Sequence, residues 1–263
     1  MKRHWLLAVN SLIVLGCLLG LWQGLVSFNH VKPYILPGPR AVAAAVYDRF
    51  PSLMSSLAIT TEEAGGGLAA SILVGVAIAM LFARWQWVRR TLYPYTILLQ
   101  TVPIVAIAPL IINWVGPGIV AVTVVTFIIC LAPIIANTTQ GLISVEENQV
   151  HLFLMYKASP AQVLLKLRLP NALPSLFTGV RISAGISVIG ALTGELFAGS
   201  TQVGQGGLGY AITYANNQME TAYMFALVFA ATMLGFTFFF IVMFLEWLAL
   251  HNWHESKRQQ IAE

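Results

Sequence analysis

The chain contains a series of apolar stretches that are each long enough to cross a lipid bilayer, beginning with residues 5–28 and ending with residues 222–249. Hydrophobic residues make up 58% of the 263 residues and charged residues only 9%. Soluble domains carry about 25% charged residues, so this composition excludes an ordinary soluble domain. Because spanning segments must satisfy their own backbone hydrogen bonds, such stretches predict an all-α integral membrane protein.

We expect six transmembrane helices in a single permease-like domain that covers residues 1–263. The first apolar stretch could instead be a signal peptide, but it is longer than the usual apolar region of about 7–15 residues and lacks an A-x-A-like cleavage site. The third span should be broken by Pro103 and Pro109, since proline removes a helix hydrogen bond. The expected spans are residues 5–28, 55–84, 92–114, 119–137, 175–198 and 222–249.

Two spans carry small residues at four-residue spacing, which lets a neighbouring helix approach closely in lipid. The second span has Gly67, Ser71, Gly75, Ala79 and Ala83 at this spacing. The fifth has Gly179, Ser183, Ser187 and Ala191, and the series leads to Glu195. These faces predict close helix–helix contacts.

The polar segment 138–174 interrupts the apolar pattern and should face water or a partner. With the N-terminus inside, ten lysines and arginines fall in inner segments and three (Lys32, Arg40 and Arg49) in outer ones, while Arg181 begins the fifth span. This asymmetry follows the positive-inside rule and places segment 138–174 and both termini in the cytoplasm. The ten inner residues are Lys2, Arg3, Arg84, Arg89, Arg90, Lys157, Lys166, Arg168, Lys257 and Arg258.

Five residues in or near the spans are candidates for a transport pathway: Gln100, Pro103, Glu195, Glu62 and Glu63. Gln100 stands beside the break at Pro103, and broken membrane helices are tolerated where they line protein or a cavity. A packing kink with a satisfied amide explains these two residues equally well. Glu62 and Glu63 also fit anchoring at the interface, and Glu195 fits an ion near the outer interface.

The sequence carries no recognisable catalytic motif. It lacks the G-x-x-x-x-G-K-[ST] loop, so it should not bind ATP through a P-loop itself, and it lacks H-E-x-x-H and metal-spaced cysteines. Cys17 and Cys130 both lie in apolar stretches and imply no disulfide. We therefore expect a transport subunit that takes its energy from elsewhere, with no metal or cofactor of its own, rather than an enzyme.

Segment 141–174 resembles the cytoplasmic loop of ABC importer permeases, whose pattern is E-A-A-x3-G-x9-I-x-L-P. Residues 167–170 match the closing I-x-L-P, and counting back places His151 at the glutamate and Lys157 at the glycine. Residues 102–110, 173–183, 194–196 and 207–210 resemble other motifs of one branch of this family, which imports nitrate, sulfonates, taurine, bicarbonate and pyrimidine precursors.

The resemblance implies a type I importer fold with a coupling helix between the fourth and fifth spans, in a bacterial inner membrane. Its partners would be a cytoplasmic ABC ATPase dimer that binds ATP and Mg²⁺, a second permease subunit in a homo- or heterodimer, and an extracytoplasmic binding protein that delivers a small solute. By resemblance, loop 144–170 would couple to the ATPase through His151, Leu152, Phe153, Tyr156, Lys157, Ala158, Ser159, Leu169 and Pro170.

Lysine at position 157 departs from the family pattern, because glycine there allows a positive φ that lysine adopts only at a cost in free energy. The turn should therefore be built differently or at greater cost. The ATPase could have a complementary acidic groove, the chain could be the degenerate half of a heterodimer, or coupling could be lost. In the last case, the chain would be a non-transporting membrane scaffold or sensor derived from such a permease.

Overall fold

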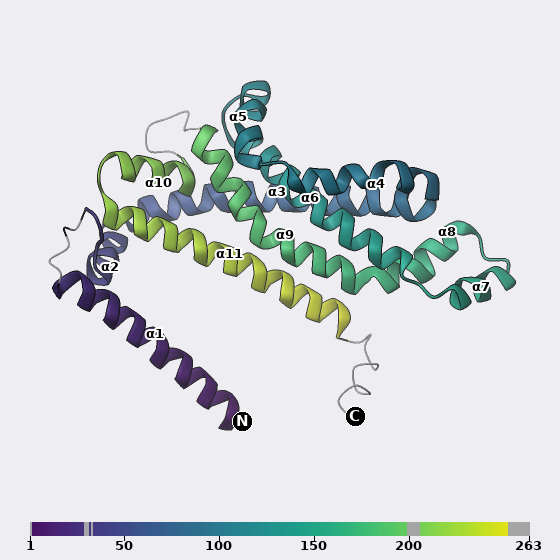
Figure 1. Cartoon of the computed structure of the whole chain (residues 1–263), viewed down its shortest axis with the longest axis horizontal. Coiled ribbons are helices and arrows are strands. Elements are labelled where there is room, and N and C mark those ends of the chain that lie inside the picture. The colour runs from purple at the N-terminus through teal and green to yellow at the C-terminus, as the bar shows by residue number, and fades with distance from the viewer. Residues whose placement is uncertain (1, 29–31, 33, 199–205, 252–263) are drawn as a thin grey trace.

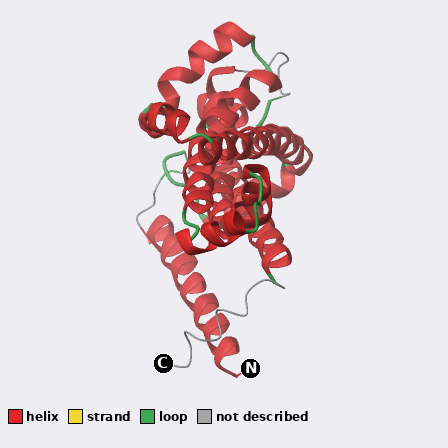
Figure 2. Ribbon diagram, turned by 90° about the vertical axis from the view of Figure 1, so that its right-hand side faces the viewer, coloured by secondary structure: helices red, strands yellow, loops and turns green. Residues whose placement is uncertain are grey.

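The computed structural model describes residues 2–28, 32, 34–198 and 206–251, and within these ranges every regular element is helical (Figures 1 and 2). For residues 2–12 and 15 it describes only the backbone. The elements are α1 (Lys2–Phe28), α2 (Pro39–Asp48), α3 (Phe50–Arg84), α4 (Gln86–Thr101), α5 (Ile104–Val115), α6 (Ile119–Ile143), α7 (Glu147–Met155), α8 (Pro160–Val163), the π-helix η1 (Leu164–Arg168), α9 (Leu169–Ala198), α10 (Leu208–Asn217) and α11 (Thr221–Leu250).

Helix α6 is the centre of the bundle, packed between α3 and α9 (Figure 1). Ser71 on α3 donates a hydrogen bond to the carbonyl of Phe127 on α6, at 2.8 Å. From the other side, Ser183 on α9 donates to the carbonyl of Cys130, at 2.9 Å. Both serines belong to the predicted small-residue faces, so the predicted close helix contacts are confirmed.

Four helical stretches of the described chain are long and apolar enough to cross a membrane. They are α3, α6, α11 and the continuous stretch Pro160–Ala198, which joins α8, η1 and α9. Helices α4 and α5 meet the same criterion as a pair, which makes five. Helix α1 contributes the shorter apolar segment Gly16–Phe28. The sixth span therefore stays a prediction.

The third span is broken at one proline. Helices α4 and α5 meet at a bend of 101°, where Val102 and Pro103 separate them. The predicted break at Pro103 is confirmed, but the predicted break at Pro109 is wrong, because α5 continues through it. Pro94 likewise lies inside α4. Pro109 is the sixth residue of α5, so it removes one helix hydrogen bond, and packing against neighbouring helices can offset this loss.

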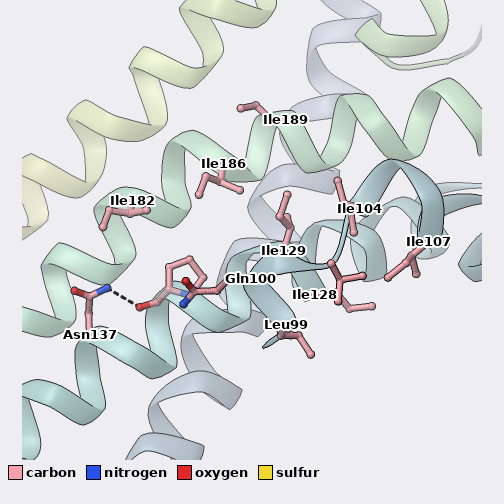
Figure 3. A pocket seen from close by; sticks show the side chains of 12 residues that line it. Leu99, Gln100, Ile104, Ile107, Ile128, Ile129, Asn137, Ile182, Ile186 and Ile189 are labelled. Carbon is pink, nitrogen blue, oxygen red and sulfur yellow. Dashed lines mark hydrogen bonds between the residues drawn. The ribbon is translucent and has the colours of Figure 1, made fainter. Parts of the chain in front are cut away.

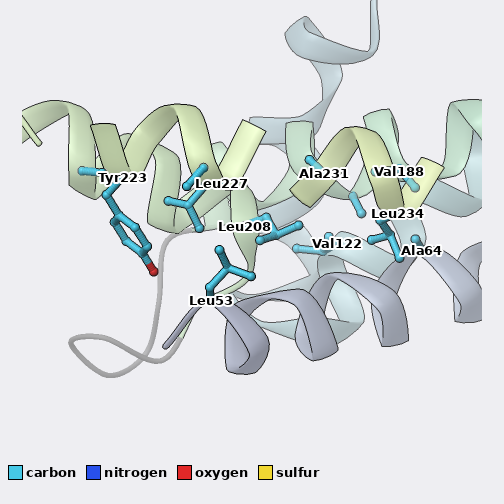
Figure 4. Close-up of a cluster of buried hydrophobic side chains, with 12 residues drawn as sticks. Leu53, Ala64, Val122, Val188, Leu208, Tyr223, Leu227, Ala231 and Leu234 are labelled. Carbon is cyan, nitrogen blue, oxygen red and sulfur yellow. The ribbon is translucent and has the colours of Figure 1, made fainter. Parts of the chain in front are cut away.

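Buried apolar side chains from five helices, α3, α6, α9, α10 and α11, form one cluster (Figure 4). Leu53 of α3, Leu208 of α10, and Leu227 and Leu234 of α11 belong to this cluster, together with Val122 of α6. Salt bridge Arg49–Glu220 lies between the segments that precede α3 and α11. This packing holds the short helix α10 against the long ones.

Helix α1 extends away from the other helices (Figures 1 and 2). It contacts α2, and the ring of its Trp22 lies near the ring of Phe225 on α11, with centroids 6.0 Å apart. Helices α7 and α8 project from the opposite end of the bundle to α2 and α10 (Figure 1). The structure therefore has two ends, an arm end with α7 and α8, and a cap end with α2 and α10.

Candidate functional site

The arm is formed by α7, the turn that follows it, and α8. Helix α6 runs on to Ile143, and η1 leads into α9 at Leu169, so most of segment 138–174 is helical. Helix α7 has no buried residue, and Met155 and Tyr156 at its end are 81% and 82% exposed. The arm therefore presents an apolar tip.

Lys157 adopts a positive φ of 53°, the left-handed conformation that glycine would adopt without strain. Its N–H donates to the carbonyl of Leu154 at 2.9 Å, and the N–H of Ala158 donates to the carbonyl of Phe153 at 3.0 Å. These two bonds form a Schellman motif, which normally has glycine at this position. The turn is thus the one a glycine would make, built at greater cost, as the sequence led us to expect.

A capping box starts α8 directly after this turn. Ser159 Oγ accepts a hydrogen bond from the N–H of Gln162, while Gln162 Oε1 accepts one from the N–H of Ser159, at 2.7 Å. Two consecutive capping motifs leave few free backbone groups between α7 and α8. The connection between α7 and α8 is therefore well hydrogen-bonded.

The residues predicted to contact an ATPase fall into two groups, one on the arm and one at its base. His151, Leu152, Tyr156, Lys157 and Ser159 are exposed on α7 and its turn, and Phe153 and Ala158 are half-buried behind them. Leu169 and Pro170, in contrast, are half-buried in the first turn of α9, at the base of the arm. A partner that contacts the tip of the arm could therefore touch the residues of α7 and its turn, but not Leu169 and Pro170.

An elongated cavity of about 520 Å³ lies between the α4–α5 bend, α6 and α9 (Figure 3). Isoleucines form most of its wall, and none of its twelve lining residues is charged. Gln100 lines it from the end of α4, and Val102 and Ile104 line it on either side of Pro103. The lining isoleucines are Ile104, Ile107, Ile128, Ile129, Ile182, Ile186 and Ile189.

Two amides are the polar groups that can orient a molecule in this cavity (Figure 3). Asn137 on α6 donates through Nδ2 to the carbonyl of Pro133, at 2.8 Å, which leaves its Oδ1 able to accept. The Gln100 side chain is exposed and makes no hydrogen bond to any described residue. The cavity therefore combines apolar walls with one fixed acceptor and one free amide.

The three carboxylate candidates lie elsewhere, toward the cap end. Glu195 is buried, and it accepts hydrogen bonds from the Thr60 hydroxyl at 2.6 Å and from the N–H of Gly209. Glu63 is buried beside it, and one Glu63 oxygen has no hydrogen-bond partner among the described residues. Glu62 is exposed on the next position of α3. None of the three lines the cavity that holds Gln100.

The approach of α10 to Glu195 explains the glycine before that helix. A Cβ added at Gly207 would lie 1.9 Å from Glu195 Oε1 and 2.7 Å from Thr60 Oγ1. Because a side chain there would overlap both atoms, only glycine fits at this position. The G-L-G sequence at residues 207–209 thus has a packing reason.

The sequence did not indicate three residues that the structure brings into these sites. Asn137 closes the expected fourth span, and no role was predicted for it; its amide bonds to the carbonyl of Pro133, four residues earlier. For Thr60, no pattern in the sequence predicts a contact with Glu195. Glu246 on α11 forms an ion pair with Arg181, which lies inside α9 rather than at its start.

No group of three or more histidine, cysteine, aspartate or glutamate residues in the described part of the chain could hold a metal ion. Cys17 and Cys130 are both free thiols there.

Comparison with known proteins places these features in a family. The model of the family "Binding-protein-dependent transport system inner membrane component" matches residues 71–249. A probable ABC transporter permease protein of Haemophilus influenzae is 31% identical over 93% of this chain and 96% of its own length. The formylaminopyrimidine transport permease protein ThiX of Halalkalibacterium halodurans is 34% identical over 78% of this chain and 80% of its own. The riboflavin transport system permease protein RibX of Chloroflexus aurantiacus is 30% identical over 95% and 91%.

The family match covers α6 and α9 in full and α11 up to Ala249, together with the arm and the cavity between the α4–α5 bend, α6 and α9. The relatives extend the likeness over almost the whole chain. The chain belongs to the family of inner membrane components of binding-protein-dependent transport systems, and it is a permease subunit of an ABC importer.

Proposed function

We propose that the arm couples this permease to a cytoplasmic ABC ATPase dimer, with α7 as the coupling helix. The exposed apolar tip at Met155 and Tyr156 is the observation that carries this proposal. Apolar side chains this exposed on a short helix outside the bundle are typical of a surface that a partner covers. The two caps around Lys157 let the arm transmit a displacement of its tip to α6 and α9.

The ATPase dimer would bind ATP and Mg²⁺, and this chain would bind no cofactor. A second permease subunit, identical or related, would face the α4–α5 bend, and an extracytoplasmic binding protein would deliver the solute at the cap end. Six spans with both termini in the cytoplasm fit this arrangement. ATP binding would then shift the permease between two states that it already samples.

The Gln100 cavity would form this subunit's half of the pathway, with Pro103 setting the bend that opens it. Its walls carry apolar groups and two amides but no charge. An anion would have to lose its hydration there without gaining a cationic partner. We therefore favour a small uncharged solute with hydrogen-bonding groups, in the manner of the pyrimidine and riboflavin named for two relatives.

Coupling is tested by capture of the cognate ATPase on the immobilised, detergent-solubilised permease. Lys157→Glu changes the charge at the tip and should reduce the captured ATPase several-fold, without changing the thermal unfolding of the permease. Lys166→Glu is the matched control, because it makes the same charge change on an exposed residue of η1. Equal capture by Lys157→Glu and the unmodified protein would show that the tip is not the contact.

Transport is tested with the assembled importer in liposomes, by the stimulation of ATP hydrolysis when the loaded binding protein is added. A transporting permease should show this stimulation, and a scaffold should show none. Gln100→Leu should reduce solute uptake while leaving ATPase capture intact, since position 100 is remote from the arm tip. Unchanged uptake by Gln100→Leu would remove this cavity from the pathway.

A further inference from the structure

We propose that the base of the arm holds a binding site for a phosphate-type anion, such as a lipid phosphodiester or free inorganic pyrophosphate. The site is a cavity of about 600 Å³ at the arm end of the bundle. Arg84 lines it from the end of α3, Arg89 from α4 and Arg168 from η1. From α7, His151 and Glu147 complete the polar wall.

The three arginines have no acidic partner among the described residues, where the ion pairs are Arg49–Glu220 and Arg181–Glu246. Arg168 donates to the carbonyl of Ala83 at 3.0 Å, and its buried Nε has no hydrogen-bond partner there. Arg89 also repels Arg168 electrostatically. Guanidinium groups gathered in this way form charge-assisted hydrogen bonds to phosphate oxygens, which would relieve the repulsion.

The start of α4 adds to the attraction for an anion. This sixteen-residue helix begins at Gln86, which lines the cavity, and no side chain caps its first turn. The free N–H groups and the helix dipole there favour negative charge. Glu147 is the one acidic side chain among the described residues that line the cavity, so it opposes an anion and partly offsets the arginines.

A second cavity of about 200 Å³ shares Arg84 and Arg168 with the first. Its remaining wall is largely apolar, with Leu154, Val163 and Leu164 among its residues. A basic cavity that opens beside an apolar one suits a molecule with a phosphate head and an apolar tail. Basic pockets between membrane helices bind anionic lipid heads in this way.

An anion bound here would connect α3, α4 and η1 to α7, and would hold the arm against the bundle. Its effect on coupling rests on the proposed function of the arm. Binding itself does not, because it depends only on the cavity, so it can be measured without any ATPase.

The test is native mass spectrometry of the purified full chain in detergent, titrated with phosphatidylglycerol or phosphatidylcholine. Inorganic pyrophosphate is added in a second arm as a competitor. Phosphatidylglycerol should bind more tightly than phosphatidylcholine, and Arg89→Gln should weaken it about tenfold, as expected for loss of a charge-assisted hydrogen bond. Glu147→Gln should tighten it. Arg90→Gln is the matched control, an exposed arginine of α4 outside the cavity.

Displacement of the lipid by pyrophosphate would support the site and identify the phosphate group as what it recognises. Retention of the lipid against pyrophosphate would support the site with a lipid as its occupant. The proposal is overturned if neither phosphatidylglycerol nor pyrophosphate binds, or if Arg89→Gln and Arg90→Gln weaken binding equally. The opposite effect expected of Glu147→Gln keeps the test decisive if Arg89→Gln does not fold.

Discussion

Thr60 on α3 donates a 2.6 Å hydrogen bond to Glu195 on α9, 135 positions away in the sequence. The same hydroxyl oxygen accepts a bond from the N–H of Leu208, at 2.8 Å, where α10 begins. One side chain with no exposed surface thus connects three helices at the cap end of the bundle. We interpret Glu195 as a residue that fixes α10 in place, in addition to any role in transport.

Thr60→Val should lower the stability of the permease, because valine has a similar shape but leaves Glu195 Oε1 and the N–H of Leu208 without this partner. Buried groups left unpaired cost about 1–3 kcal/mol each. Thr61→Val is the control, since the exposed Thr61 hydroxyl donates to the carbonyl of Leu57 in its own helix. Thermal unfolding in detergent should separate the two variants by several degrees. Equal midpoints would show that the bridge does not contribute.

Gly67→Ala should also destabilise the bundle, because its Cβ would lie 2.5 Å from the Cβ of Thr126 on α6. Overpacking of this kind costs about 1–3 kcal/mol. Gly65→Ala, two residues earlier on the same helix, is the matched control, since its Cβ would meet the Phe238 ring at an ordinary 3.7 Å. The same unfolding assay should show a loss for position 67 alone. A loss at both positions would contradict an origin in the Thr126 contact, since alanine otherwise favours a helix over glycine.

Much of the bundle could be predicted from the sequence, because lipid imposes strong local rules. Ser71 and Ser183 each belong to a series of small residues at four-residue spacing, and these series predicted close packing. Both serines donate hydrogen bonds to carbonyls of α6. The break at Pro103 was predicted from its chemistry alone. The same chemistry failed for Pro109, because a helix tolerates a lost hydrogen bond where neighbouring helices support it.

The sites were harder to predict because they depend on how helices far apart in the sequence face each other. Glu62 and Glu63 look equivalent in the sequence, yet one is exposed and the other is buried beside Glu195. Gln100 lines a cavity, but the second amide on its wall, Asn137, comes from a different helix. Local patterns identify which faces are apolar. They do not give the rotation that brings two faces together.

Lys157→Gly should stabilise the turn at the end of α7, because glycine adopts a positive φ without strain. A left-handed residue with a side chain costs about 1–2 kcal/mol, and the greater freedom of glycine in the unfolded chain removes part of the gain. We expect slower hydrogen exchange at the N–H of Ala158, which bonds to Phe153. Lys157→Val should have the opposite effect. Met219→Gly is a second check, since Met219 has a φ of 57° in the same motif after α10.

Arg181 and Glu246 form an ion pair between α9 and α11, which is partly buried, with side chains 34% and 20% exposed. Removing one partner leaves a charge in an apolar setting, so Arg181→Met and Glu246→Leu should each destabilise the bundle by about 1–3 kcal/mol, less than for a fully buried pair. The double variant should recover most of this loss, because apolar replacement of both ions is often neutral. A double-mutant cycle on thermal unfolding measures the difference. Additive losses in the double variant would show that the two side chains act independently.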